Sequence, residues 1–221
     1  MTLGRRLAAE ALGTGLLVSM VVGSGIMAER LAGENVALAL LANSIATGTG
    51  LVALILAFGG VSAHFNPVVT LAAAQARRLP WREVPAHVIA QVGGGIVGVV
   101  AAHVMFGLPL VTASRHERAG VSQLVGELVA TFGLLLVIAG CTRWKSSSVA
   151  FAVGAYIASA YWFTSSTSFA NPAVTIARAL TDTFTGIRPS DVPGFIAAQL
   201  VGASLAVLAS RWLFHAGDER S

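Results

Sequence analysis

The chain has 221 residues, of which 55% are hydrophobic and 11% are charged, and its formal net charge is +4. With a mean hydropathy of +0.77, it has too few polar side chains to cover the surface of a soluble globular protein. Its basic residues are scattered over short segments and form no patch, so the basic balance does not indicate a nucleic-acid partner. The composition predicts a protein embedded in a lipid bilayer.

Six apolar stretches along the chain are predicted to cross the membrane, since a helical crossing takes about 20 apolar residues. The first stretch contains Glu10 and is too long for the apolar part of a signal peptide, so we interpret it as a retained span. The six predicted spans lie near residues 7–28, 36–58, 86–110, 121–140, 148–163 and 193–214.

The lysine and arginine residues in the loops and at the ends of these spans alternate between the two sides of the membrane. The side that carries both termini has nine of them, namely Arg5, Arg6, Arg77, Arg78, Arg82, Arg143, Lys145, Arg211 and Arg220. The other side has five, namely Arg30, Arg115, Arg118, Arg178 and Arg188. The positive-inside rule therefore predicts that both termini are cytoplasmic.

Two related motifs, Asn66-Pro67-Val68 and Asn171-Pro172-Ala173, interrupt the apolar pattern. An Asn side chain accepts hydrogen bonds from the first amides of a helix, and Pro is best tolerated as the first helical residue. Each motif is therefore predicted to begin a half-helix of about three turns. The re-entrant loops that precede the two half-helices are expected at residues 59–65 and 164–170. The first half-helix is expected to end near Leu79-Pro80.

The two motifs belong to an internal repeat. When the segment that begins at Glu10 is aligned with the segment that begins at Glu127, both Asn-Pro motifs come into register. Each half holds three spans, an odd number, so the second half must enter the membrane from the opposite face. We predict a single domain over residues 1–221, formed by repeat 1 at about 1–112 and an inverted repeat 2 at about 119–221.

Inverted repeats with interrupted helices place a site near the membrane midplane. The two half-helices would meet at their N-termini, near Asn66 and Asn171. Their positive dipole ends disfavour a cation at this point, while the two amide side chains can bind a neutral polar solute. The pattern predicts a pore for uncharged solutes.

These residues resemble the aquaporin, or major intrinsic protein, family. The resemblance is carried by residues 62–70, by residues 169–173 and by the paired Glu10 and Glu127. It implies an all-α membrane protein with six transmembrane helices and two re-entrant half-helices. It also implies a homotetramer with one pore per subunit, in which Asn66 and Asn171 lie at the pore centre and a narrower filter lies toward the outside.

The family normally has an Arg in the filter directly after the second motif, whereas this chain has Val174. The replacement is expected to widen the constriction and to make it less polar. Spacing within the family places the other filter residues at Thr47, with Ala46 as the alternative, at Ser159 and at Ser168. The predicted filter contains no aromatic residue and no charge.

Other residues of the predicted pore have two interpretations each. Arg178, one helical turn after the filter, either replaces the missing charge at the pore mouth or extends to the lipid headgroups. Glu10 and Glu127 are more readily explained as a scaffold for the re-entrant loops than as a proton relay. His64 is expected to pack and hydrogen-bond rather than to sense pH.

Val68, where the family usually has Ala, is expected to crowd the contact between the half-helices.

The local sequence after Asn171, with Val174 and residues 181–184, is similar to bacterial aquaporins associated with arsenic resistance. This similarity implies a passive channel in the bacterial inner membrane for arsenous acid and related metalloid or methylated arsenic species. Arsenous acid is neutral near neutral pH and presents hydroxyl groups much as glycerol does. Glycerol and water are alternative solutes within the same family.

The rival class is an ion-coupled secondary transporter, which can also combine inverted repeats with broken helices. The chain has no further ionisable pair near the midplane to bind a coupling ion, and a non-conducting membrane protein is the third alternative.

Motifs of common enzyme classes are absent, so no enzyme activity is expected. The single Cys141 excludes an internal disulfide and a multi-cysteine metal site. We expect no cofactor and no metal, and as partners a small neutral solute and the bilayer.

Overall fold

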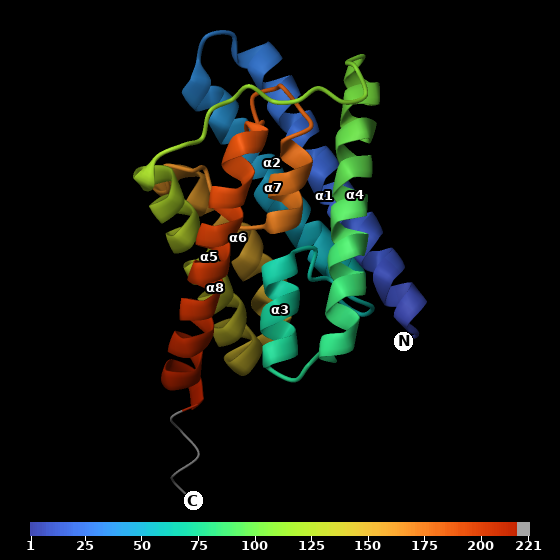
Figure 1. Ribbon diagram of the computed structural model, residues 1–221, viewed down its shortest axis with the longest axis vertical. Helices are drawn as coiled ribbons and strands as arrows, with labels where there is room; N and C mark the ends of the chain where they lie inside the picture. Colours follow the sequence, from blue (N-terminus) through green and yellow to red (C-terminus); the bar gives the residue numbers. More distant parts are fainter. Residues whose placement is uncertain (216–221) are drawn as a thin grey trace, which may run out of the picture.

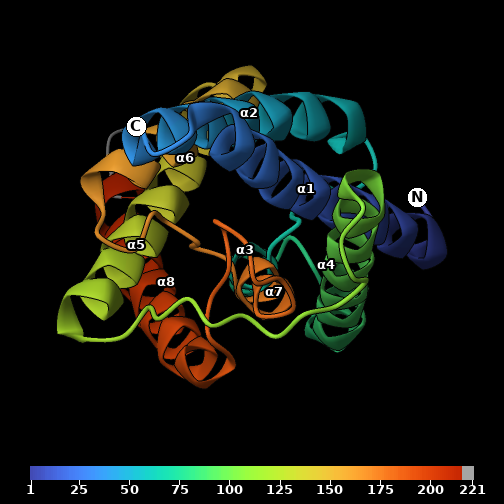
Figure 2. The same ribbon diagram turned by 90° about the horizontal axis from the view of Figure 1, so that it is seen from above.

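The computed structural model describes residues 1–215 and contains eight α-helices and no β-strand in that range. Six long helices surround two short ones at the centre (Figure 2). Short 3-10 turns precede α4, α6 and α8. The helices are α1 (Leu3–Ala32), α2 (Val36–Phe58), α3 (Pro67–Gln75), α4 (Val84–Phe106), α5 (Val121–Trp144), α6 (Val149–Phe163), α7 (Pro172–Arg178) and α8 (Val192–His215).

The six predicted spans correspond to the six long helices, and α2 has the predicted bounds. The start of α1 and the end of α8 lie at the same end of the bundle, called the termini end below (Figure 1). Helix α6 has 15 residues, a length of about 22 Å, which is shorter than a bilayer core of about 30 Å. Two features that the sequence predicted, Arg220 and the end of repeat 2, lie outside the described residues.

The two short helices, α3 and α7, are the predicted half-helices, and they lie end to end inside the ring of long helices (Figures 1 and 2). Helix α3 ends at Gln75 instead of near Leu79. The reason is that Arg77 adopts a left-handed conformation with φ of 57°, so that the Arg78 amide donates to the Ala73 carbonyl (2.9 Å) and closes the helix.

Glycines allow the long helices of each repeat to approach one another closely. A Cβ atom on Gly94 or Gly98 of α4 would collide with the carbonyl oxygen of Ala11 or Gly15 in α1. In the second repeat, a Cβ atom on Gly202 of α8 would collide in the same way with α5. Close backbone contact of this kind replaces the hydrophobic effect as a source of stability between helices in lipid.

This contact leads to a prediction about stability. Replacing Gly94 with Ala should destabilise the protein by about 2 kcal/mol, because overpacking of a tight contact costs about 1–3 kcal/mol. The matched control is Gly93→Ala, since the neighbouring position has no atom within 4 Å of the added methyl group. The thermal unfolding midpoint of the purified protein in detergent measures both effects. Equal midpoints for the two variants would contradict the close contact between α1 and α4.

Candidate functional site

The two half-helices begin at Asn side chains that cap them, as the sequence predicted. Asn66 Oδ1 accepts a hydrogen bond from the Val68 amide (3.1 Å). Asn171 Oδ1 accepts from the amides of Ala173 (3.0 Å) and Val174 (3.3 Å). In both motifs the proline that follows the Asn is the first helical residue, where its missing N–H costs nothing.

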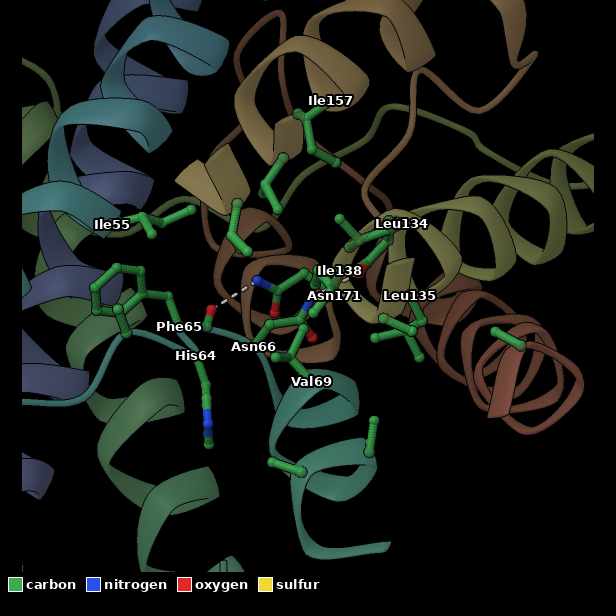
Figure 3. Close-up of a pocket in the computed structure, with 18 of the residues that line it drawn as sticks. Ile55, His64, Phe65, Asn66, Val69, Leu134, Leu135, Ile138, Ile157 and Asn171 are labelled. Atoms are coloured by element: carbon green, nitrogen blue, oxygen red, sulfur yellow. Dashed lines mark hydrogen bonds between the residues drawn. The ribbon is translucent and has the colours of Figure 1, made fainter. Parts of the chain in front are cut away.

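The same two Asn side chains join the repeats to each other (Figure 3). Asn66 Nδ2 donates to the Ala170 carbonyl (2.8 Å), and Asn171 Nδ2 donates to the Phe65 carbonyl (2.7 Å). The accepting residues both have positive φ, 50° at Phe65 and 47° at Ala170. Each amide NH2 group carries two hydrogens, so one N–H of each Asn is left for a solute.

The first re-entrant loop is held by the buried carboxylate of Glu10. Its Oε1 accepts from Ser62 Oγ (2.6 Å) and from the His64 amide (2.8 Å). Its Oε2 accepts from the Phe65 amide (2.7 Å) and from Gln91 Nε2 (2.7 Å). These bonds satisfy loop amides that would otherwise be unpaired inside the membrane.

Glu127 holds the second loop in the equivalent way. Its two oxygens accept from the amides of Phe169 (2.8 Å) and Ala170 (2.8 Å) and from Gln199 Nε2 (2.6 Å). Neither Glu127 nor Glu10 lines the cavity described below. The contacts are those of a scaffold, and they offer no route for a proton relay through the cavity.

A cavity of about 760 Å³ extends past the junction of the half-helices. Around the junction its wall contains both Asn side chains and apolar residues of the surrounding helices, among them Ile55, Leu134, Ile138 and Ile157 (Figure 3). Near the termini end the wall includes the basic residues Arg77, Arg78, Arg143 and Arg211. The described residues that line the cavity include no Asp or Glu. The wall is therefore apolar in large part, with amide, hydroxyl and cationic groups.

Three of the four predicted filter residues lie on the cavity wall: Thr47, Ser168 and Val174. The alternative to Thr47, Ala46, is not among the lining residues. The Ser168 hydroxyl has no hydrogen-bond partner within residues 1–215. Thr47, Ser168 and Val174 are each no more than 5% exposed, so any solute that reaches them contacts hydroxyl and methyl groups.

The prediction of Ser159 as a filter residue is wrong. Ser159 is exposed and is not among the lining residues. The residues of α6 that line the cavity are spaced by four and form one face of the helix, namely Val149, Val153, Ile157 and Tyr161. Because successive helical residues are about 100° apart, a residue two positions from Ile157 faces nearly the opposite way.

Tyr161 is the residue of α6 that lies beside Thr47 on the cavity wall. It is buried, and its hydroxyl lies 3.1 Å from Thr47 Oγ1, so the two residues form a hydrogen bond. The expectation of a filter without an aromatic residue is therefore wrong. The four-residue spacing that runs through Ile157 to Tyr161 is the sequence signal that could have identified it.

Arg178 does not extend to the lipid headgroups. Its side chain is only 2% exposed and lines the cavity. Its Nε donates to the Thr185 carbonyl, and its guanidinium lies over the Phe169 ring at 3.3 Å from the centroid. The wall near Val174 thus contains a buried cation, which agrees with the first of the two interpretations of Arg178, a charge inside the pore in place of the missing Arg.

Arg118, in the long connection between α4 and α5, was predicted only as a loop residue. Its Nε donates to the Gly186 carbonyl (2.8 Å), and its guanidinium lies 4.9 Å from the centroid of the Phe169 ring. Burial lowers the pKa of Arg118, and the charge of Glu127 opposes that shift. The residue ties the connection to the loops on either side of α7.

His64 and Val68 lie near the junction but have different surroundings. The His64 ring lines the cavity, and its Nδ1 hydrogen-bonds Thr70 Oγ1 (3.1 Å). Val68 is fully buried in a cluster with Leu135, Ala203 and Ala206. Its additional methyl groups are therefore accommodated against α5 and α8, which differs from the expected crowding against the other half-helix.

Comparisons with known proteins agree with the overall fold. Residues 1–147 match the model of the family described as "Major intrinsic protein". The chain is 54% identical over 212 residues to the aquaglyceroporin AqpS of Rhizobium meliloti (strain 1021), covering 96% of this chain and 91% of that protein. It is 35% identical over 145 residues to aquaporin NIP1-1 of Zea mays, covering 62% of this chain and 48% of that protein. The X-ray structure of the aquaglyceroporin from Plasmodium falciparum has the same fold, with a TM-score of 0.70, 21% identity and coverage of 94% of this chain and 95% of that one.

Proposed function

The chain belongs to the major intrinsic protein family and is a membrane channel for small solutes, and we propose that its favoured solutes are uncharged metalloid hydroxides such as arsenous acid. Methylated arsenic species, glycerol and water belong to the same proposal as further solutes. Flow through the channel is passive, so its direction follows the gradient of the solute across the membrane.

The observation that carries this proposal is Val174 on the cavity wall. The family usually has an Arg at this position, whose long side chain would project into the same space. With Val174, Thr47 and Ser168 in the wall, a solute of several hydroxyl groups meets hydroxyl partners and methyl groups. Arsenous acid and glycerol both have that chemistry, and the 54% identical relative is named an aquaglyceroporin.

The absence of acidic residues from the described cavity wall further supports a neutral solute. A cation would meet arginines, the positive ends of two half-helices, and neutral amide and hydroxyl groups, with no carboxylate among the described lining residues. Burying an unpaired cation in such surroundings is costly, whereas a neutral hydroxylated solute exchanges hydrogen bonds with water for bonds with the wall.

The proposed setting is the bacterial inner membrane, with both termini cytoplasmic. The arginines and the lysine near the termini end outnumber those of the opposite loops, which supports this orientation by the positive-inside rule. Large apolar side chains are exposed on the outer faces of the long helices, as contact with lipid or with other subunits requires. The homotetramer implied by the family is part of the same proposal.

Uptake of arsenous acid and glycerol by cells that produce the protein tests the proposal. We expect uptake that rises linearly with concentration and that a proton uncoupler does not change. Cells with an empty vector give the background. Saturable uptake that the uncoupler abolishes would instead indicate an ion-coupled transporter, and normal glycerol uptake without arsenous acid uptake would contradict the proposed solute.

The buried charge of Arg178 leads to a separate prediction. Replacing Arg178 with Ala should increase the leak of potassium ions through proteoliposomes, because the one buried cation in the described cavity wall is removed. Arg143→Ala, at an exposed position near the termini end of the same cavity, is the matched control. Unchanged ion leak in correctly inserted Arg178→Ala protein would show that this side chain is not the cation barrier.

A further inference from the structure

The charges on the cavity wall are all of one sign. Within residues 1–215, five arginines line the cavity, and four of them, Arg77, Arg78, Arg143 and Arg211, are exposed near the termini end. The fifth, Arg178, is buried beside the predicted filter. The four exposed residues are explained by the orientation of the protein in the membrane, whereas the buried one requires a different explanation.

Arg178 has hydrogen-bonding groups that the described protein does not satisfy. A guanidinium carries five N–H donors in a planar fork. Its Nε donates to the Thr185 carbonyl, but neither terminal nitrogen has a hydrogen-bond partner or an ion pair among residues 1–215. Because the side chain lines the cavity, the unused donors can be reached only from within it.

The surroundings of Arg178 do not neutralise its charge. Arg118 lies against the same Phe169 ring, at 4.9 Å from the centroid compared with 3.3 Å for Arg178. Glu127, which holds the loop containing Phe169, uses both oxygens to accept from two amides and from Gln199. Two guanidinium groups thus lie near one carboxylate whose oxygens already accept hydrogen bonds from other groups. The net local charge is therefore positive.

We propose that the terminal nitrogens of Arg178 bind a small planar monovalent oxyanion inside the cavity. Planar oxyanions with two oxygens on one edge, such as nitrate, bicarbonate and simple carboxylates, match the two parallel N–H bonds of a guanidinium. The Ser168 hydroxyl, in the same wall and also without a partner in the described chain, adds a neutral donor.

The consequence of this site is competition between anions and neutral solutes. The inference rests on the proposed function in one respect, since it takes the cavity as the path of the solute. An oxyanion held by Arg178 lies in that path beside Val174 and the Tyr161–Thr47 pair, so its occupancy lowers solute permeability. The channel then responds to the anion composition of the solution that reaches this part of the cavity.

The test measures glycerol permeability of proteoliposomes while nitrate replaces gluconate at constant ionic strength, because gluconate is a carboxylate whose six-carbon polyhydroxy chain excludes it from the small anions proposed. In the wild type we expect a saturable loss of permeability with nitrate, and a weaker effect of spherical chloride. Arg178→Gln should lose the nitrate dependence, since the charge and the planar fork are both removed. Arg143→Gln, at an exposed arginine of the same cavity, should keep it.

The outcomes separate the anion site from the channel itself. No protein-dependent glycerol flux in gluconate alone would contradict the proposed function. Normal flux in gluconate that nitrate leaves unchanged, or that nitrate lowers equally in Arg178→Gln, would overturn the anion site and leave the channel intact. If Arg178→Gln does not assemble, Arg178→Lys is used in its place. This variant keeps the positive charge but lacks the planar guanidinium, so it tests whether the guanidinium geometry favours nitrate. In the wild type, nitrate must lower glycerol permeability more than chloride does, and in Arg178→Lys this difference must shrink. If either result is not found, the proposal is also overturned.

Discussion

Replacing Val174 with Arg is expected to lower the permeability of the protein to glycerol and arsenous acid by at least about tenfold, which corresponds to about 1.4 kcal/mol of additional barrier. Val174 lies in the first turn of α7 and lines the cavity with only 5% of its surface exposed. An Arg side chain at this position would occupy part of the cavity that Thr47 and Ser168 also line. Water, which is smaller than either solute, should lose less permeability. Stopped-flow light scattering of proteoliposomes measures all three solutes.

Two control variants separate the size of the new side chain from its charge. Val174→Leu adds volume without charge and should reduce glycerol permeability less than Val174→Arg. The double variant Val174→Arg, Arg178→Val keeps the number of buried cations, which avoids repulsion between two arginines one helical turn apart. If glycerol and arsenous acid still permeate correctly inserted Val174→Arg protein at the rate of the wild type, Val174 does not set the width of the pore.

Replacing Glu127 with Gln is expected to destabilise the protein by roughly 3 kcal/mol, because hydrogen bonds to a buried charged group contribute about 1.5–3 kcal/mol each. The carboxylate oxygens of Glu127 accept from the amides of Phe169 and Ala170 and from Gln199 Nε2. An amide side chain has only one oxygen, so its NH2 group would face a donor of the loop. The loop that carries Ser168 would then lose its position, and solute flux should fall with stability.

The thermal unfolding midpoint and glycerol flux of the same preparation check this result. Glu34→Gln, at an exposed residue between α1 and α2, is the matched control and should behave as the wild type. Glu10→Gln should resemble Glu127→Gln, since Glu10 holds the first loop in the equivalent way. A wild-type midpoint and wild-type flux in Glu127→Gln would show that the charge of this residue does not hold the loop.

The parts of the structure that could be predicted from sequence depend on local chemistry or on the repeat. Asn66 and Asn171 cap the half-helices because an Asn-Pro pair at a helix start satisfies backbone groups within a few residues. The paired Glu10 and Glu127 could be interpreted as scaffold because non-helical backbone inside a membrane needs acceptors for its amides. Both predictions needed no knowledge of how distant segments pack.

The predictions that failed depended on distances counted along the chain. Ser159 was placed in the filter by counting back from Asn171 with the usual spacing of the family, but the lining face of α6 passes through Ile157 and Tyr161. The end of α3 was missed because a non-glycine residue, Arg77, adopts a left-handed conformation. Neither loop spacing nor such a conformation can be identified from residue types alone.

The burial of Arg178 could not be predicted because it depends on the fold of the segment that follows α7. Residues 179–188 fold back over the helix, so that the Ile187 amide donates to the Arg178 carbonyl (3.3 Å) and the Thr185 carbonyl accepts from its Nε. The connection between α4 and α5 brings Arg118 to the same aromatic ring. These contacts decide between the two interpretations of Arg178 that the sequence left open, because they place its side chain on the cavity wall and away from the lipid headgroups.

The cavity beside Val174 is proposed to admit neutral solutes larger than water. Stopped-flow light scattering of proteoliposomes with the wild-type protein tests it most directly, by comparing water, glycerol and arsenous acid with protein-free vesicles. We expect glycerol and arsenous acid both to enter faster than they enter protein-free vesicles. Fast water flux with both larger solutes excluded would contradict it.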